Sequence, residues 1–201
     1  ALETERQLLL TEIGEIIPIR DIPRDNGQID IVTDSGVFLL AGNVRELSFT
    51  QSSIIEDTNR YGTTGSTLSG LFVDGQDITP GTSGAQKISG GSISGEFAVR
   101  DSITTDFTDS LDAMSRDLID RFSNDSIDST KPAGAQGLFT DATYAADATQ
   151  TVGVASRIGI NTAVDPNAGG AVYRIRDGIG ATSPGNTGNT TIIDGMITAM
   201  T

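Results

Sequence analysis

One line of apolar residues between positions 99 and 122 constrains the fold more than any other feature of the sequence. Its seven members recur at steps of 4, 4, 4, 3, 4 and 4. This spacing places them along one side of an α-helix and predicts a helix over residues 96–124, about 40 Å long. The members of this apolar stripe are Val99, Ile103, Phe107, Leu111, Met114, Leu118 and Phe122.

The stripe needs partner helices, because burying it would contribute about 10–20 kcal/mol before entropy is counted. Residues 2–17 repeat apolar side chains at helical spacing up to Pro18, and a second such run follows Thr190. We expect both segments to pack on the stripe, so that a charge at Leu111 would unfold this helical layer. The apolar positions are Leu9, Ile13 and Ile16 in the first segment, and Ile192, Ile193, Met196, Ile197 and Met200 in the second.

The segments between these helices have β-like patterns. QIDIVTDSGVFLLAG alternates apolar and polar residues, and it predicts a hairpin region with turns at Asp25-Asn26-Gly27 and Asp34-Ser35-Gly36. GLFVDGQDI predicts another hairpin that turns at Asp74-Gly75. Further short strands are expected, separated by Gly, Ser, Thr and Asp: these lie around 46–50, 68–73, 86–89, 151–160 and 171–175.

These elements predict an α+β fold: a small helical bundle around one long central helix, with Gly-rich antiparallel β segments forming a projecting lobe. The helical layer would contain residues 1–20, 95–127 and 186–201, and the β-rich lobe residues 27–94 and 137–180. The chain starts within a helical pattern and without an initiator Met, so we expect it to be a piece of a longer protein.

Composition narrows the classes of partner. The chain has 27 acidic and 13 basic residues, a formal net charge of −14, and no basic cluster, which argues against binding to nucleic acid or an anionic membrane. Its apolar share of 36% predicts a thin core, and no apolar run comes near the roughly 18 residues of a membrane span. Without cysteine, disulfides and thiolate metal sites are excluded.

The segment GSISGEFAVRD (91–101) could be a phosphate-binding turn or a plain helix start. A P-loop needs Lys and Ser/Thr after its second Gly, whereas Glu96 and Phe97 stand there. We favour a helix start with Ser94 or Gly95 near the N-cap. The chain also contains no His, which removes the Ser-His-Asp and HExxH mechanisms. No catalytic residue and no cofactor are predicted.

Acidic residues raise two further hypotheses, a glycosidase carboxylate pair and calcium binding. The acids of the long helix lie mostly off the stripe, and we interpret them as a solvated face: Asp101, Asp106, Asp109, Asp112, Asp117 and Asp120. Three Asp/Asn-rich loops, at 24–30, 123–128 and 164–170, are candidates for calcium, but none fits the EF-hand template. Turn formation explains all three, so no metal site is predicted.

The order of motifs resembles the family of flagellar hook-associated proteins found at the hook–filament junction. ETERQLLLTEIGEII followed by QIDIVTDSGVFLLAG is similar to the middle of that family. SGGSISGEFAVRD resembles the start of its next helix through Gly90, Gly91, Gly95, Arg100 and Asp101. LDAMSRDLIDRFSND and GLFTD (137–141) resemble the segments that come next, the former through Leu111, Asp112, Met114, Leu118, Phe122 and Asn124.

The resemblance implies an extracellular structural protein of the bacterial flagellum that serves motility and has no catalytic activity. Such a protein is exported unfolded through the flagellar type III apparatus and self-assembles into a ring that joins hook and filament. Its partners would be copies of itself, the hook protein and the next hook-associated protein, with a flagellar export chaperone as a further candidate. Two alternatives stay open: an extracellular adhesin or carbohydrate-binding β module, and an enzyme such as a muramidase.

Overall fold

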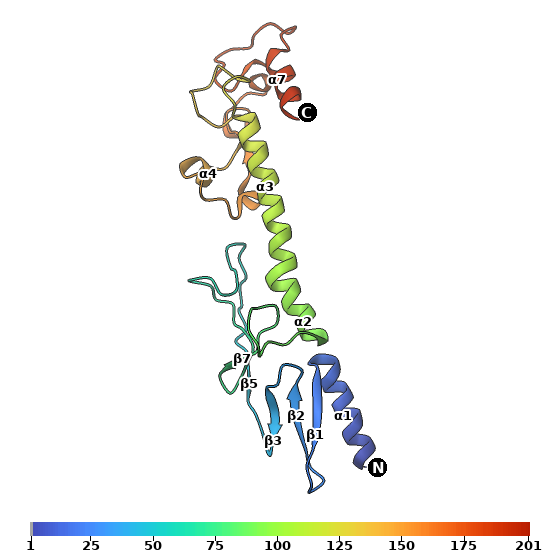
Figure 1. Cartoon of the computed structure of the whole chain (residues 1–201). Coiled ribbons are helices and arrows are strands. Elements are labelled where there is room, and N and C mark those ends of the chain that lie inside the picture. The colour runs from blue at the N-terminus through green and yellow to red at the C-terminus, as the bar shows by residue number, and fades with distance from the viewer. Residues whose placement is uncertain (1) are drawn as a thin grey trace. The chain divides into compact units, whose positions relative to one another are not determined.

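The computed structural model describes residues 2–201 and contains helices together with small antiparallel sheets (Figure 1), which confirms the predicted α+β class. The chain forms two compact units, one ending at Asp106 and the other beginning at Phe107. Among the described residues, no helix is both long enough and apolar enough to cross a membrane.

The first unit opens with helix α1 (Leu2–Ile16), which ends before Pro18, as predicted. A four-stranded antiparallel sheet follows, with strands in chain order. Both predicted turns form, and Gly27 (φ +79°) and Gly36 (φ +91°) supply the left-handed backbone that these turns need. The strands are β1 (Ile19–Pro23), β2 (Ile29–Thr33), β3 (Phe38–Ala41) and β4 (Asn43–Val44).

A second, three-stranded antiparallel sheet contains β5 (Leu47–Ser48), β6 (Phe72–Val73) and β7 (Gln76–Asp77). The predicted hairpin between β6 and β7 is confirmed, and its two turn residues, Asp74 and Gly75, both have positive φ (46° and 80°). The strand expected at 86–89 does not form, although Ile88 within it is buried. Burial there comes from packing of a loop rather than from strand pairing.

A single run of helical structure begins at Gly91. It consists of α2 (Gly91–Ala98), the π-helical turn η1 (Val99–Ile103) and α3 (Thr104–Phe122). The predicted helix is thus present, but its N-cap is Gly90 rather than Ser94 or Gly95. Gly91 has φ +75°, and a Cβ at this position would lie 2.2 Å from the carbonyl oxygen of Ile16, so only glycine fits.

The core of the first unit joins both sheets to α2. Phe97 is the residue of α2 that enters this core, where Phe49 meets its ring edge-on with centroids 6.2 Å apart. The buried members of the core are Ile17, Val37, Leu71, Val73, Ile78, Ile88 and Phe97.

In the second unit, loops and short helices surround α3, and only one pair of strands forms: β8 (Phe139–Thr140) with β9 (Gly159–Ile160). The strands expected across 151–160 and 171–175 are therefore wrong except at the end of the first. The helices are α4 (Ala142–Ala146), α5 (Val154–Arg157), the 3-10 turn η2 (Pro166–Ala168), α6 (Tyr173–Asp177) and α7 (Thr191–Ala199).

Helix α7 confirms the predicted C-terminal helix. Its buried residues Ile192 and Met196 pack with Phe122 of α3, and Phe139 meets the Phe122 ring edge-on at 5.1 Å. Because the two units are separate bodies, two expectations stay predictions: the combined helical layer of 1–20, 95–127 and 186–201, and a single lobe of 27–94 and 137–180.

Candidate assembly surface

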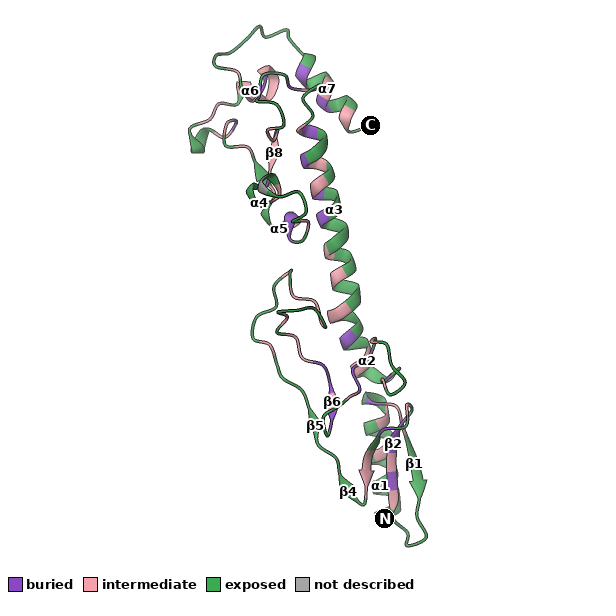
Figure 2. Cartoon of the chain, turned by 60° about the vertical axis from the view of Figure 1, so that its left-hand side comes forward, coloured by how far each residue is buried: buried purple, intermediate pink, exposed green. Residues whose placement is uncertain are grey.

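Helix α3 buries a face that differs from the predicted stripe. Figure 2 shows buried and exposed residues alternating along this helix. The buried residues, Asp112, Ser115, Ile119 and Phe122, are spaced by 3, 4 and 3. The first three of them each follow a stripe residue by one position, so the chain covers the face beside the stripe.

Asp112 explains why this neighbouring face is buried. Its side chain is 1% exposed, and its two carboxylate oxygens accept hydrogen bonds from the backbone N–H groups of Gly153 and Ala155, both at 2.7 Å. These N–H groups belong to the start of α5, whose own N-cap, Gly153, has no side chain to offer. Asp112 therefore acts as the N-cap of α5 from another helix, which suits a negative charge.

A second polar side chain of α3 holds the same loop. The guanidinium of Arg116 donates to the carbonyl oxygen of Thr151 at 2.8 Å. The interpretation of the helix acids as a solvated face is accordingly wrong for Asp112. Asp117, in contrast, forms an exposed i,i+4 ion pair with Arg121 at 2.6 Å.

The stripe itself is largely open. Phe107 is 65% exposed and Leu111 39%, whereas Phe122 at the end of α3 is only 5% exposed. The expectation that terminal helices of this chain cover the stripe is therefore wrong within each unit: α1 leaves Val99 and Ile103 exposed in the first, and α7 leaves Phe107, Leu111 and Met114 exposed in the second. Leu118 is half-buried, and it packs with Phe122 in the core of the second unit. The chain's own loops pack on the adjacent face because Asp112 and Arg116 bind their backbone there.

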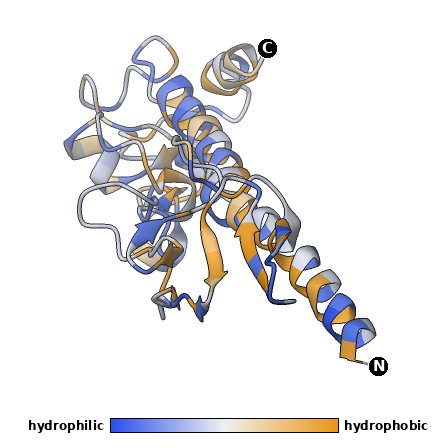
Figure 3. Ribbon diagram, turned by 60° about the horizontal axis from the view of Figure 1, so that its bottom comes forward, coloured by the Kyte–Doolittle hydropathy of each residue, from blue (hydrophilic) through white to orange (hydrophobic). Residues whose placement is uncertain are grey.

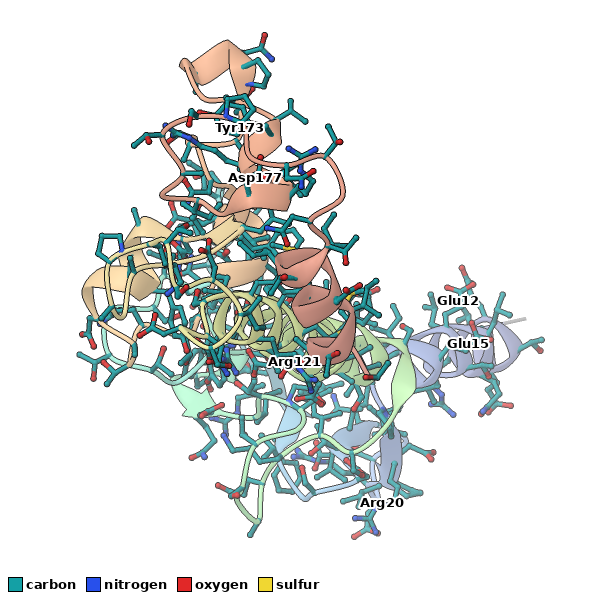
Figure 4. All side chains as sticks on the ribbon, turned by 90° about the horizontal axis from the view of Figure 1, so that it is seen from above. Glu12, Glu15, Arg20, Arg121, Tyr173 and Asp177 are labelled. Carbon is teal, nitrogen blue, oxygen red and sulfur yellow. The ribbon has the colours of Figure 1, made fainter. Side chains whose placement is uncertain are left out.

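Other helices also expose apolar residues. No residue of α1 is buried, and Figure 3 shows apolar positions along it. In α7, the residues beside the buried Ile192 and Met196 face outward, and Arg121 of α3 donates to the carbonyl oxygen of Ala199 at 2.7 Å (Figure 4). The large exposed apolar residues are Leu2, Leu8, Leu9, Ile13 and Ile16 in α1, and Ile193 and Ile197 in α7, with Met200 directly after it. We call these residues, with the five open members of the stripe, the exposed helical faces.

The loops proposed for calcium use their acids for structural contacts. Asp30 pairs with Arg24 at 2.7 Å through Oδ2, while its buried Oδ1 has no hydrogen-bond partner among residues 2–201. Asp125 pairs with the buried Lys131, and this hydrogen bond lowers the pKa of the Asp125 carboxyl. Asp165 caps η2 by accepting from the N–H of Asn167. Among residues 2–201, no group of three or more acidic side chains could hold a metal ion.

The glycine-rich start of the helical run is occupied by protein. The Ile16 carbonyl oxygen lies against Gly91, and a carbonyl oxygen repels a phosphate rather than binding it. A carbohydrate-binding module would present exposed aromatic rings to the sugar, but two of the tyrosines use their hydroxyls for contacts within the protein. Tyr61 contacts Thr79 through its hydroxyl at 3.2 Å, and Tyr144 donates to Asp120 at 2.9 Å. Burial and the Asp120 carboxylate together raise the pKa of the Tyr144 hydroxyl.

Residues 1–137, which include α1, both sheets of the first unit and all of α3, match the family described as flagellar hook-associated protein FlgK helical domain. The chain belongs to this family. No curated protein and no solved structure matches it. The family is that of a structural protein of the flagellum, which confirms the resemblance drawn from the motifs between Glu3 and Asp141 and gives the adhesin alternative no support.

Family membership places the seven stripe residues inside the matched helical domain. The periodicity of the sequence found the helix and its apolar residues, but it did not find the polar contacts of Asp112 and Arg116. Their partners are backbone groups 41, 43 and 35 residues away, and a backbone N–H or carbonyl leaves no mark in the sequence. The functional role of the stripe thus stays a prediction.

Proposed function

We propose that this chain is a building block of the junction between flagellar hook and filament, and that its exposed helical faces pack against neighbouring subunits. The observation that carries this proposal is the open stripe along η1 and α3 within a domain of the hook-associated family. Five large apolar side chains along one helix are unusual on the surface of a monomer, and such surfaces are typical of protein–protein contacts.

The energetics favour coverage by protein. Each large apolar side chain that leaves water contributes about 1.5–3 kcal/mol, so burying Phe107, Leu111 and Met114 together would contribute several kcal/mol to association. Copies of this chain are the first partner that we propose, because every copy carries the same exposed helical faces. The hook protein and the next hook-associated protein would contact the two sides of such a ring, and an export chaperone would cover the faces before assembly.

Two further parts of the proposal concern location and chemistry. We propose that the protein is exported and works outside the cell, as the hook and filament do. We also propose that it catalyses no reaction, since the chain contains no His and its buried acids all accept hydrogen bonds within the protein: Asp30, Asp112, Asp128 and Asp141. Turnover of peptidoglycan by the purified chain would contradict this part.

The experiment compares two substitutions of equally exposed apolar residues. Phe107→Asp places a charge on the stripe, whereas Ile54→Asp places one in a loop of the first unit. Phe107 is 65% and Ile54 67% exposed, so neither substitution should change the melting temperature of the purified chain by more than a few degrees. This equality makes Ile54→Asp the matched control.

Both substitutions would then be introduced into the full-length protein in its flagellated host. We expect Phe107→Asp cells to lose swimming and to release flagellin into the medium, because filament subunits have no junction to build on. Ile54→Asp cells should swim like the parent. Normal swimming and attached filaments in Phe107→Asp cells would refute an assembly role for the stripe.

A further inference from the structure

The π-helical turn η1 interrupts an otherwise α-helical run. The backbone N–H of Thr104 donates to the carbonyl oxygen of Val99, five residues earlier, where an α-helix would use the N–H of Ile103. Single π-turns inside α-helices are rare and occur mostly at functional positions. This one lies three residues before Asp106, where the first compact unit ends.

Apolar packing does not hold this turn in place. None of its five residues is buried, and both of its large apolar side chains, Val99 and Ile103, are exposed. Polar contacts that hold it come from the side chains of Arg100 within the turn and Thr105, two residues after its end.

Arg100 ties the turn to the loop that contains Tyr61 and Ser69. Its Nη1 donates to the carbonyl oxygen of Ser69 at 2.9 Å, and its side chain is only 17% exposed. The guanidinium carbon lies 4.5 Å from the ring centroid of Phe97 and 5.4 Å from that of Tyr61, both in cation–π range. Nε and Nη2 also bind both carboxylate oxygens of Asp101, at 2.6 and 2.7 Å.

The surroundings of Arg100 are closely packed. Phe97 is buried in the core of the first unit, and a Cβ added at Gly70 would lie 2.3 Å from the Tyr61 hydroxyl, so the loop packs closely there. On the other side of the turn, the hydroxyl of Thr105 donates to the carbonyl oxygens of Asp101 and Ser102, at 3.0 and 2.8 Å. The Thr105 hydroxyl thereby supplies a donor where the backbone hydrogen bonds change from the π-helical to the α-helical pattern.

We propose that η1 is a register switch in the helical run and that Arg100 holds it in the π form. When the guanidinium leaves Ser69, the turn closes into an α-helical turn in which Ile103 replaces Thr104 as the donor to Val99. One residue then enters the α-helical ladder, which changes the helix by about 1.5 Å of rise and about 100° of rotation. This inference does not depend on the proposed function.

The test reads the hydrogen bond directly. In a labelled sample of the whole chain, NMR scalar coupling through the hydrogen bond should connect the Thr104 nitrogen with the Val99 carbonyl carbon. In Arg100→Ala this coupling should be lost, and a coupling from Ile103 to Val99 should replace it. Arg116→Ala is the matched control, because Arg116 also donates to a loop carbonyl oxygen but lies in a regular part of α3. It should leave the Thr104–Val99 coupling intact.

Two further variants keep the proposal testable if Arg100→Ala does not fold. Arg100→Lys keeps the charge, but it loses the planar guanidinium that stacks on Phe97 and Tyr61 and binds Asp101 through two nitrogens. It should therefore weaken the Thr104–Val99 coupling. Deletion of Ser102 should give a folded chain with a regular α-helix, in which Arg100→Ala changes nothing further around Val99. Persistence of the Thr104–Val99 coupling in both Arg100 variants, or an unfolded Ser102 deletion, would overturn the proposal.

Discussion

The buried carboxylate of Asp112 gives the sharpest prediction on stability. In Asp112→Ala, the N–H groups of Gly153 and Ala155 lose their acceptors, both at 2.7 Å, in a place that water hardly reaches. An unsatisfied buried N–H costs about 1–3 kcal/mol, so the substitution should lower the free energy of unfolding of the second unit by about 2–5 kcal/mol. Asp112→Asn keeps one acceptor oxygen and should cost less than Asp112→Ala.

The assay is urea unfolding followed by circular dichroism and by tyrosine fluorescence; two of the three tyrosines, Tyr144 and Tyr173, lie in the second unit. Asp117→Ala is the control, because Asp117 lies on the same helix but its carboxylate forms an exposed ion pair with Arg121. That pair should contribute about 0.5 kcal/mol or less. A loss below about 0.5 kcal/mol in Asp112→Ala would refute the assignment of Asp112 as the cap of α5.

Two more predictions concern a helix start and an acidic group. Gly91→Ala should lower the melting temperature, because its Cβ would collide with the Ile16 carbonyl. In the control Gly95→Ala, the Cβ meets no atom within 4 Å, and the substitution should stabilise α2 by about 0.5–1 kcal/mol. Equal melting temperatures of the two variants would contradict the contact between Gly91 and Ile16. The hydrogen bond from Arg176 lowers the pKa of Asp177 to about 2. The contribution of this pair to stability is therefore present above the ordinary value of about 3.9 and is lost as the pH falls through about 2. An NMR titration of the Asp177 carboxyl should show this midpoint, and Arg176→Ala should raise it; an unchanged midpoint in the variant would contradict the pairing.

Local patterns predicted the elements of this fold well. Turn residues with obligatory positive φ placed the hairpins at Gly27, Gly36 and Asp74-Gly75, and helical periodicity found all three long helices. The prediction of strands was wrong where a side chain from a distant part of the chain caps the backbone, as at Gly153. There the contact with Asp112 stabilises a short helix in a segment whose own residues favour β structure.

Whether the stripe is buried or exposed could not be predicted from its spacing. Periodicity identifies the apolar side of α3 but not which molecule covers it, and the polar residues Asp112 and Ser115 on the buried side carry no apolar signal. The π-turn, in contrast, had a signal in the sequence. Three successive steps of four from Val99 to Leu111 overshoot a turn of 3.6 residues by about 40° each, and a wider turn offsets part of this drift.

On α3, the buried residues Asp112, Ser115 and Ile119 each follow a residue of the stripe by one position. This offset limits how the length of the helix can vary among related chains. Inserting or deleting one amino acid between Leu111 and Ile119 would rotate the following part by about 100°, so that neither its buried side nor its open side would line up with that of the preceding part. Within α3, related chains should therefore accept only length changes of whole turns. Thus gaps in a future alignment of such relatives would reveal which turns of α3 are constrained from two directions at once.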